Sequence, residues 1–293
     1  MLVNKFFIFV ILFILITAGI TGIILQSLRN SPKSPASPPK IVQTKVTIIE
    51  GWTTQNIAED LDLNAKRTEQ PHLADKQEFL DAVKNFSVAD YPLLSSKPAS
   101  QGLEGFVFPD TYFLPVHAGP STTESSILIT KALDNFSNKF TPQMESDAAA
   151  RGMSVYQIVT LASIIEKETG RNVVTDEQQK ALDEQRKIIA GIFYNRLAIG
   201  MPLQSDATVN FVTKKSSPSA TTEDTKTDSP YNTYLYKGLP PGPICNPSLS
   251  SILAAIYPTH TNYFYFLHKQ PSGEAVYSVT YEEQLQNKQK YLQ

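Results

Sequence analysis

The chain has 293 residues, of which 41% are hydrophobic and 18% are charged, and its formal net charge is −2. This length can bury one large core or two modest ones, and the balanced charge argues against nucleic acid as a partner. The single cysteine, Cys245, excludes an internal disulfide and a cysteine-rich metal site, and the four histidines lack ligand-type spacing. We therefore expect neither a metal nor a cofactor.

The N-terminal segment is apolar enough to cross a lipid bilayer. After a short tail, 1–5, residues 6–28 contain no charged side chain and are long enough for a membrane-spanning helix. A cleaved signal peptide is the alternative, but its apolar region is usually shorter and ends at a small-residue cleavage site. We expect an uncleaved, single-pass anchor, followed by a Pro/Ser-rich extended linker at 29–40.

The remainder is expected to have an α+β fold in two parts. Residues 41–96 predict a small module, with a strand near 42–49 and helices over 55–61 and 76–85. Residues 97–293 predict a larger mixed domain. Its expected elements are helices over 125–140, 154–170, 180–199, 247–256 and from 281 onward, a mobile polar loop at 213–230, and a β-hairpin with strands at 262–269 and 275–279.

Glu166 is the most informative single residue. It lies near the end of the predicted helix 154–170, which is apolar on most sides and therefore belongs inside a domain. A carboxylate there is costly unless it is paired, protonated or used. Burial and the negative end of the helix dipole both favour the protonated acid.

Glu168 follows two residues later, roughly 200° around the helix axis, so the two carboxyl groups cannot share one site. The alternative for this segment is structural. In that interpretation Glu166 and Glu168 form solvated ion pairs with Lys167 or Arg171 at the end of the helix.

Six short blocks follow one another between residues 100 and 293: LEGFVFPDTY (103–112), ASIIEKET (162–169), FYNRL (193–197), GMPLQSD (200–206), SPYNTY (229–234) and GLPPGPI (238–244). In sequence and in order they resemble the signature motifs of the YceG-like endolytic murein transglycosylases, the MltG family. The anchor, the linker and a small LysM-like module at 41–96 also match the layout of this family, whose catalytic domain would occupy 97–293.

The resemblance implies a lytic transglycosylase of the bacterial cytoplasmic membrane with its catalytic domain outside the membrane. Such enzymes cleave nascent peptidoglycan strands between MurNAc and GlcNAc, leave 1,6-anhydroMurNAc ends, and can thereby terminate strand elongation. Peptidoglycan synthases are the implied partners, and Glu166 is the implied general acid and base. The matching blocks also imply substrate-binding residues: Glu104, Tyr112, Asn195, Gln204, Asp206, Thr208, Tyr231, Asn232 and Thr233.

One carboxyl group is sufficient for this chemistry. A protonated acid is needed beside the leaving oxygen, and the resulting carboxylate can then accept the proton of the C6 hydroxyl, which attacks in place of water. A muramidase-type hydrolase would need a second carboxylate, for which Asp206 and Asp110 are the candidates. A non-catalytic, membrane-anchored peptidoglycan-binding partner of cell-wall synthases is the other alternative.

Overall fold

The structure is a computed structural model and describes residues 17, 19–24, 26–27, 43–68, 76–115, 123–169, 175–215 and 219–292. The chain divides into two compact units, residues 1–41 and 42–293. The described residues between 17 and 27 are helical. The rest of the span expected at 6–28, the tail 1–5 and the linker 29–40 lie outside the described residues.

Membrane-spanning capacity can be assessed only for the part of the chain that the structure describes. There, no single helix combines the length and apolarity needed to cross a bilayer. One sharply bent helix pair, Pro142–Ala150 with Val155–Glu168, meets these requirements on length and composition alone.

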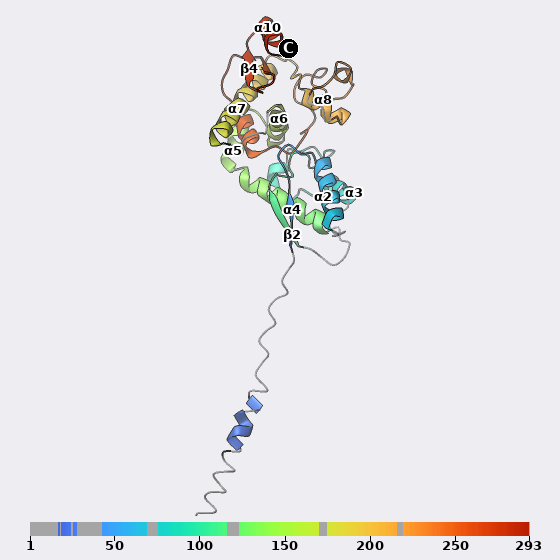
Figure 1. The fold of residues 1–293 in the computed structure, drawn as a ribbon, viewed down its shortest axis with the longest axis vertical. Helices are drawn as coiled ribbons and strands as arrows, with labels where there is room; N and C mark the ends of the chain where they lie inside the picture. The colour runs from blue at the N-terminus through green and yellow to red at the C-terminus, as the bar shows by residue number, and fades with distance from the viewer. Residues whose placement is uncertain are drawn as a thin grey trace, which may run out of the picture. The chain divides into compact units, whose positions relative to one another are not determined.

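The unit 42–293 combines helices with two small sheets, which confirms a mixed α+β fold (Figure 1). Its described elements, in chain order, are β1 (Gln43–Thr47), α2 (Thr54–Thr68), α3 (Lys76–Asn85), η1 (Pro92–Leu94), β2 (Thr111–Pro115), α4 (Thr123–Lys139), α5 (Pro142–Ala150), α6 (Val155–Glu168), α7 (Asp176–Ala198), α8 (Asp206–Thr213), η2 (Asp224–Lys226), α9 (Leu249–Ile256), β3 (Tyr265–His268), β4 (Ala275–Ser278) and α10 (Tyr281–Tyr291).

Each sheet is a two-stranded antiparallel pair. The hairpin predicted near the C-terminus is confirmed as β3 and β4. In the other sheet β1 pairs with β2, and Val46 lies opposite Tyr112. Val46, Tyr112 and Leu114 are buried, whereas Phe113 between the last two is exposed, as expected for a strand with one face on the core. This sheet joins a strand of the region 41–96 to a strand beyond 97, and the boundary between those two regions stays a prediction.

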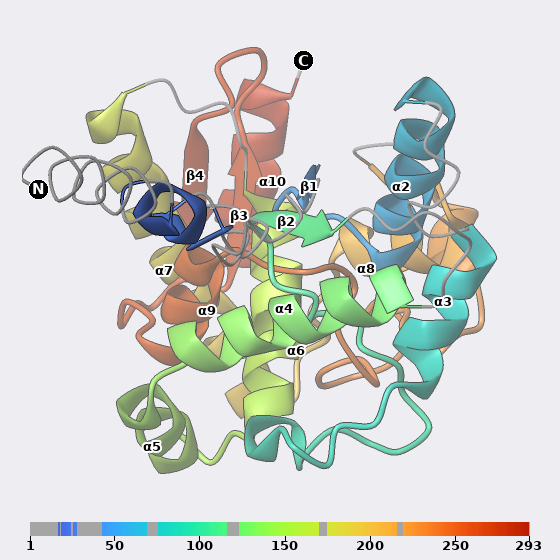
Figure 2. The ribbon, with the colours of Figure 1, turned by 90° about the horizontal axis from the view of Figure 1, so that it is seen from below.

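Helix α6 is at the centre of the unit and contacts α5, α7, α8 and α9. Figure 2 shows α7 and α9 to one side of it and α2 and α3 to the other. The helix begins with the predicted capping box, in which Ser154 and Gln157 satisfy each other's main-chain N–H groups. Six of its apolar side chains are completely inaccessible: Ile158, Val159, Leu161, Ala162, Ile164 and Ile165.

Several elements differ from expectation. Helices α5 and α8 were not predicted, and α8 occupies a stretch that reads as polar turns, although Thr208 and Val209 in it are buried. The described part of the expected mobile loop contains η2. Helix α9 starts at Leu249 rather than at 247 because Ser248 is its N-cap. Asn246, which directly precedes the predicted start and would have been the cap of a helix beginning at 247, accepts from Val107 N (3.0 Å) and donates to the Trp52 carbonyl oxygen (2.9 Å) through its side chain.

Candidate active site

The C-terminal end of α6 meets the N-terminal ends of α8 and α9, and the charge of its Lys167 acts on Glu104, which is bonded to the start of a third helix, α2. A helix N-terminus carries partial positive charge and unpaired N–H groups, so it attracts carboxylates. Each of these three helix starts contacts one glutamate. Glu104 bonds to Thr54 at the start of α2, Glu168 to Ser205 before α8, and Glu166 to Ser248 before α9.

The Glu166 carboxyl group is sealed inside the protein, since only 1% of the residue is exposed. Its Oε2 accepts three hydrogen bonds, from Ser248 N (3.1 Å), Ser248 Oγ (2.6 Å) and Ser251 Oγ (2.7 Å). Its Oε1 is buried and has no hydrogen-bond partner among the described residues. Glu166 thus ties α6 to the first turn of α9.

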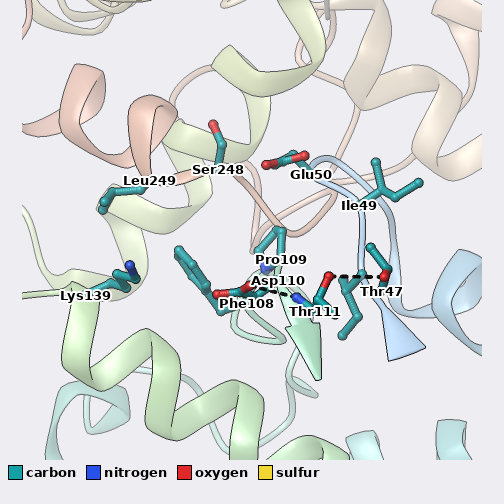
Figure 3. A pocket seen from close by; sticks show the side chains of 11 residues that line it. Thr47, Ile49, Glu50, Phe108, Pro109, Asp110, Thr111, Lys139, Ser248 and Leu249 are labelled. Atoms are coloured by element: carbon teal, nitrogen blue, oxygen red, sulfur yellow. Dashed lines mark hydrogen bonds between the residues drawn. The ribbon is translucent and has the colours of Figure 1, made fainter. Parts of the chain in front are cut away.

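Ser248, the partner of Glu166, also lines a pocket of about 410 Å³ (Figure 3). Figure 3 shows Lys139 and Leu249 on one side of this pocket and Thr47 and Ile49 on the other. Asp110 lines it and is held by hydrogen bonds to its carboxylate oxygens from Thr111 N (2.7 Å) and Asn135 Nδ2 (2.8 Å). Glu166 is not part of its lining.

Glu168 lies on the α8 side of α6 and is half-buried. Its Oε1 accepts a hydrogen bond from the Ser205 hydroxyl. Burial raises the pKa of the Glu168 carboxyl to about 7; the Ser205 hydrogen bond and the Arg196 charge lower it, and the Asp206 charge raises it. A carboxyl group with this pKa can both donate and accept a proton near neutral pH.

The hydroxyl groups around Ser205 form one connected network. Ser205 is the N-cap of α8, yet its side chain makes no capping hydrogen bond. Its main-chain N–H donates to Thr233 Oγ1 (3.0 Å), and its carbonyl oxygen accepts from Thr208 Oγ1 (2.7 Å). The Thr208 and Thr233 hydroxyl oxygens are 2.9 Å apart, and Asp206 Oδ1 accepts from Tyr234 OH (2.7 Å). The structure therefore brings three predicted residues, Asp206, Thr208 and Thr233, together beside Glu168.

Glu104 and Tyr231 form a second group on the Lys167 side of α6. The half-buried Glu104 carboxylate accepts from Thr54 N (3.0 Å), Thr54 Oγ1 (2.8 Å) and Asn246 Nδ2 (3.3 Å). Burial raises the pKa of Glu104 to about 7, against the Thr54 hydrogen bonds and the Lys167 charge, which lower it. Burial raises the pKa of Tyr231, and the charge of Glu104 raises it to a smaller extent.

The side chains of the other predicted site residues are not bonded to Glu168 or Glu104 among the described contacts, although the Gln204 main-chain N–H donates to the Thr233 carbonyl oxygen (3.0 Å). Gln204 is exposed and has a left-handed backbone, with φ of 50°. The remaining three brace the main chain: Tyr112 donates to Phe108 O (2.6 Å), Asn195 to Thr261 O (2.8 Å) and Tyr263 O (2.9 Å), and Asn232 to Thr225 O (2.9 Å) and Thr227 O (2.8 Å).

The sequence predicts no catalytic role for Glu168, and of the groups that act on it only Asp206 is among the predicted site residues. Arg196 and Tyr234 lie inside blocks FYNRL and SPYNTY, so the motif itself was a usable signal. Ser205 directly precedes an acidic residue at a helix start, which is a typical N-cap pattern. Nothing local connects Glu166 to Ser248, because 82 residues separate them.

A model of the YceG-like family matches residues 22–290. The chain belongs to the YceG-like family. This agrees with the resemblance found in the six blocks, and the match extends from before the linker almost to the end of the sequence.

The YceG-like chain is also similar to two curated relatives and to one solved structure. It is 38% identical over 217 residues to an endolytic murein transglycosylase of Bacillus subtilis, covering 74% of the chain and 54% of the relative. It is 33% identical over 266 residues to one of Streptococcus pneumoniae, covering 85% and 45%. A crystal structure of a YceG-like protein from Listeria monocytogenes superposes with a TM-score of 0.67 at 33% identity, covering 83% of this chain and 75% of that one. The chain spans about half the length of the curated relatives it matches.

Proposed function

We propose that this YceG-like chain is an endolytic murein transglycosylase. It would cut peptidoglycan glycan strands between MurNAc and GlcNAc and leave 1,6-anhydroMurNAc ends. Relatives that carry this name support the reaction. The observation that carries the proposal is the half-buried Glu168 carboxyl, whose pKa is raised to about 7 beside a network of hydroxyl groups.

We assign the general acid to Glu168 in preference to Glu166. A general acid must reach the leaving oxygen directly or through one water. The Glu166 carboxyl is almost fully enclosed, and three hydrogen bonds occupy its Oε2. Glu168 as a residue is less enclosed than Glu166, and one of its carboxyl oxygens takes no part in the Ser205 bond. Glu166 stays the alternative assignment.

The reaction needs only this one carboxyl group. Protonated Glu168 donates its proton to the glycosidic oxygen, and the C1–O bond to GlcNAc breaks. The Glu168 carboxylate then accepts the proton of the muramyl C6 hydroxyl as its oxygen bonds to C1, which restores the acid. Because the nucleophile belongs to the substrate, proximity replaces a bound water.

In the proposed cellular setting, the apolar N-terminal sequence supplies the anchor, and the family resemblance supplies the membrane and the orientation. Residues 6–28 would anchor the chain in the bacterial cytoplasmic membrane, and the linker 29–40 would hold a LysM-like module (41–96) and the catalytic domain (97–293) outside it. In this position the enzyme would meet strands as peptidoglycan synthases release them. A physical partnership with those synthases is part of the proposal.

Mass spectrometry of digested glycan strands tests the reaction. We expect wild-type protein to produce anhydro-ended fragments and Glu168→Gln to lose about 10²- to 10⁴-fold of that activity, the usual contribution of a general acid. Products that carry an added water would indicate a hydrolase, and a wild type without products would indicate a binding protein. If Glu166→Gln loses this activity while Glu168→Gln keeps it, the acid is Glu166.

A further inference from the structure

A second carboxylate lies beside the Glu168 side chain, and the reaction as proposed does not use it. Asp206 is the first residue of α8 and directly follows Ser205, whose hydroxyl bonds Glu168. Tyr234 OH donates to Asp206 Oδ1 at 2.7 Å and fixes the orientation of this carboxylate. Burial raises the pKa of Tyr234, and the hydrogen bond to Asp206 raises it to a smaller extent. The phenol therefore keeps its proton and remains a donor.

The start of α8 departs from normal helix capping in the same place. An N-cap serine usually accepts a hydrogen bond from the first turn, and loss of such a cap costs about 1 kcal/mol. Here the Ser205 hydroxyl makes no such bond and donates to Glu168 instead. Local rules are most often broken at functional sites. The start of α8 thus supplies a hydroxyl donor to Glu168, from Ser205, and a neighbouring carboxylate, Asp206, whose charge acts on it.

The charged and titratable groups around Glu168 come from three elements. From α7, Arg196 is buried and held by Leu203 O and Phe264 O. From α8 comes Asp206, and from the segment after η2 comes Tyr234.

On α6 itself, the neighbouring Lys167 acts on Glu104. Arg196 favours the charged form of Glu168, and Asp206 opposes it. Burial is the main cause of the raised pKa of Glu168, and the Asp206 carboxylate is the neighbouring charge that acts in the same direction, against Arg196.

We propose that Asp206, oriented by Tyr234, is a positioning residue that keeps Glu168 in its protonated form. This deepens the proposed function and rests on it. Asp206 does not touch the reacting atoms in this assignment. Its negative charge makes ionisation of Glu168 less favourable, so Glu168 carries its proton when the substrate binds.

The pH dependence of kcat/KM, measured on the 293-residue chain, tests this assignment. The high-pH limb of the profile reports loss of the proton from the essential acid. Removing a neighbouring negative charge eases that loss, so Asp206→Asn is expected to move the limb to lower pH by about 0.5 to 1 unit. Tyr234→Phe is expected to have no further effect on the limb in the Asp206→Asn background, because Tyr234 acts through Asp206.

A matched control lies in the same segment of the chain. Tyr236 OH donates to Asp228 Oδ1 at 2.6 Å, which repeats the tyrosine–aspartate pair on the exposed surface. Asp228→Asn removes the same charge without a role at Glu168 and should leave the limb where it is in wild type. Asp206→Glu, which restores the charge, should return the limb toward its wild-type position.

A carbon-13 NMR titration of the Glu168 carboxyl gives a readout that does not need catalysis. The signal is identified by its absence in Glu168→Gln, and its midpoint should fall in Asp206→Asn. A lower activity with an unmoved limb and midpoint would show a merely structural role and overturn the proposal. Complete loss of activity at every pH in folded Asp206→Asn would make Asp206 a reacting group and also overturn it. If Glu168→Gln keeps its activity, the proposed acid is wrong, while the NMR midpoint still decides the link between Asp206 and Glu168.

Discussion

The two sides of the α6 C-terminus use the same kind of side chain differently. On the α9 side, Glu166 is enclosed and receives three donors on one oxygen. On the α8 side, Glu168 is partly exposed, receives one hydroxyl and has a second carboxylate for a neighbour. On the α9 side three donors hold the Glu166 carboxyl group in place, whereas on the α8 side Glu168 has an oxygen outside the Ser205 bond through which a proton can be exchanged. Burial alone therefore does not identify a reactive carboxyl group; the number of donors directed at it matters as much.

Truncating each glutamate in turn tests whether the two side chains differ in their contribution to stability. Glu166→Ala leaves three donors at the start of α9 without their acceptor, so we expect the free energy of unfolding to fall by about 2–4 kcal/mol. Glu168→Ala removes a half-buried side chain with one bond and should cost about 1 kcal/mol or less. Urea unfolding measures both. Equal losses would contradict the division of roles between the two sides.

The pH dependence of stability tests the protonation of Glu168 and Glu104, the carboxyl groups bonded to Ser205 and Thr54. Burial raises the pKa of Glu104 and Glu168 to about 7 from an ordinary 4.5. Between these values the folded chain binds more protons than the unfolded chain, so their contribution to stability is full below about pH 4.5 and is lost as the pH rises through 7. Glu104→Gln should therefore show a shallower decline over this range than wild type.

Urea unfolding at several pH values between 4.5 and 7.5 checks this prediction. The exposed Glu59 offers a control, because hydrogen bonds from Gln55 and Lys76 lower its pKa. Glu59→Gln should leave the decline above pH 4.5 unchanged. A wild-type decline that Glu104→Gln fails to reduce would mean that Glu104 does not hold its proton in the folded chain.

The smallest expected change in stability concerns Tyr112, which lies on neither side of the α6 C-terminus. Tyr112 OH donates to Phe108 O and accepts from Asn135, within the strand β2 region. Tyr112→Phe should lower the free energy of unfolding by about 1 kcal/mol and leave product formation unchanged. Thermal unfolding together with product analysis checks both expectations. A loss of activity at unchanged stability would return Tyr112 to the substrate cleft.

Much of the local structure follows from the sequence, since periodicity and caps are local properties. The capping box at Ser154, helix α3 and the C-terminal hairpin are confirmed. The helical angle between Glu166 and Glu168 also correctly places them on different sides. Helix α8 was missed because its polar side chains bond to residues far along the chain, such as Thr233 and Tyr234.

Assigning a role to either glutamate required knowing what surrounds the end of α6. The sequence shows that Glu166 belongs to an apolar helix, and a buried carboxyl group then suggests catalysis. It does not show that α9 brings its N-terminus, with Ser248 and Ser251, to that carboxyl group. Nor does it show that Arg196 and Asp206 meet beside Glu168, because that depends on how α7 and α8 pack against α6.

The pairing of β1 with β2 has a consequence for dissecting the molecule. Residues 43–47 supply the only strand that covers β2 among the described residues. A chain shortened to begin at residue 97 would leave both edges of β2 with unpaired main-chain groups and would uncover Tyr112 and Leu114, which makes it a template for association between molecules. The predicted boundary after residue 96 is therefore a poor place to cut, and a fragment for study should begin before Gln43.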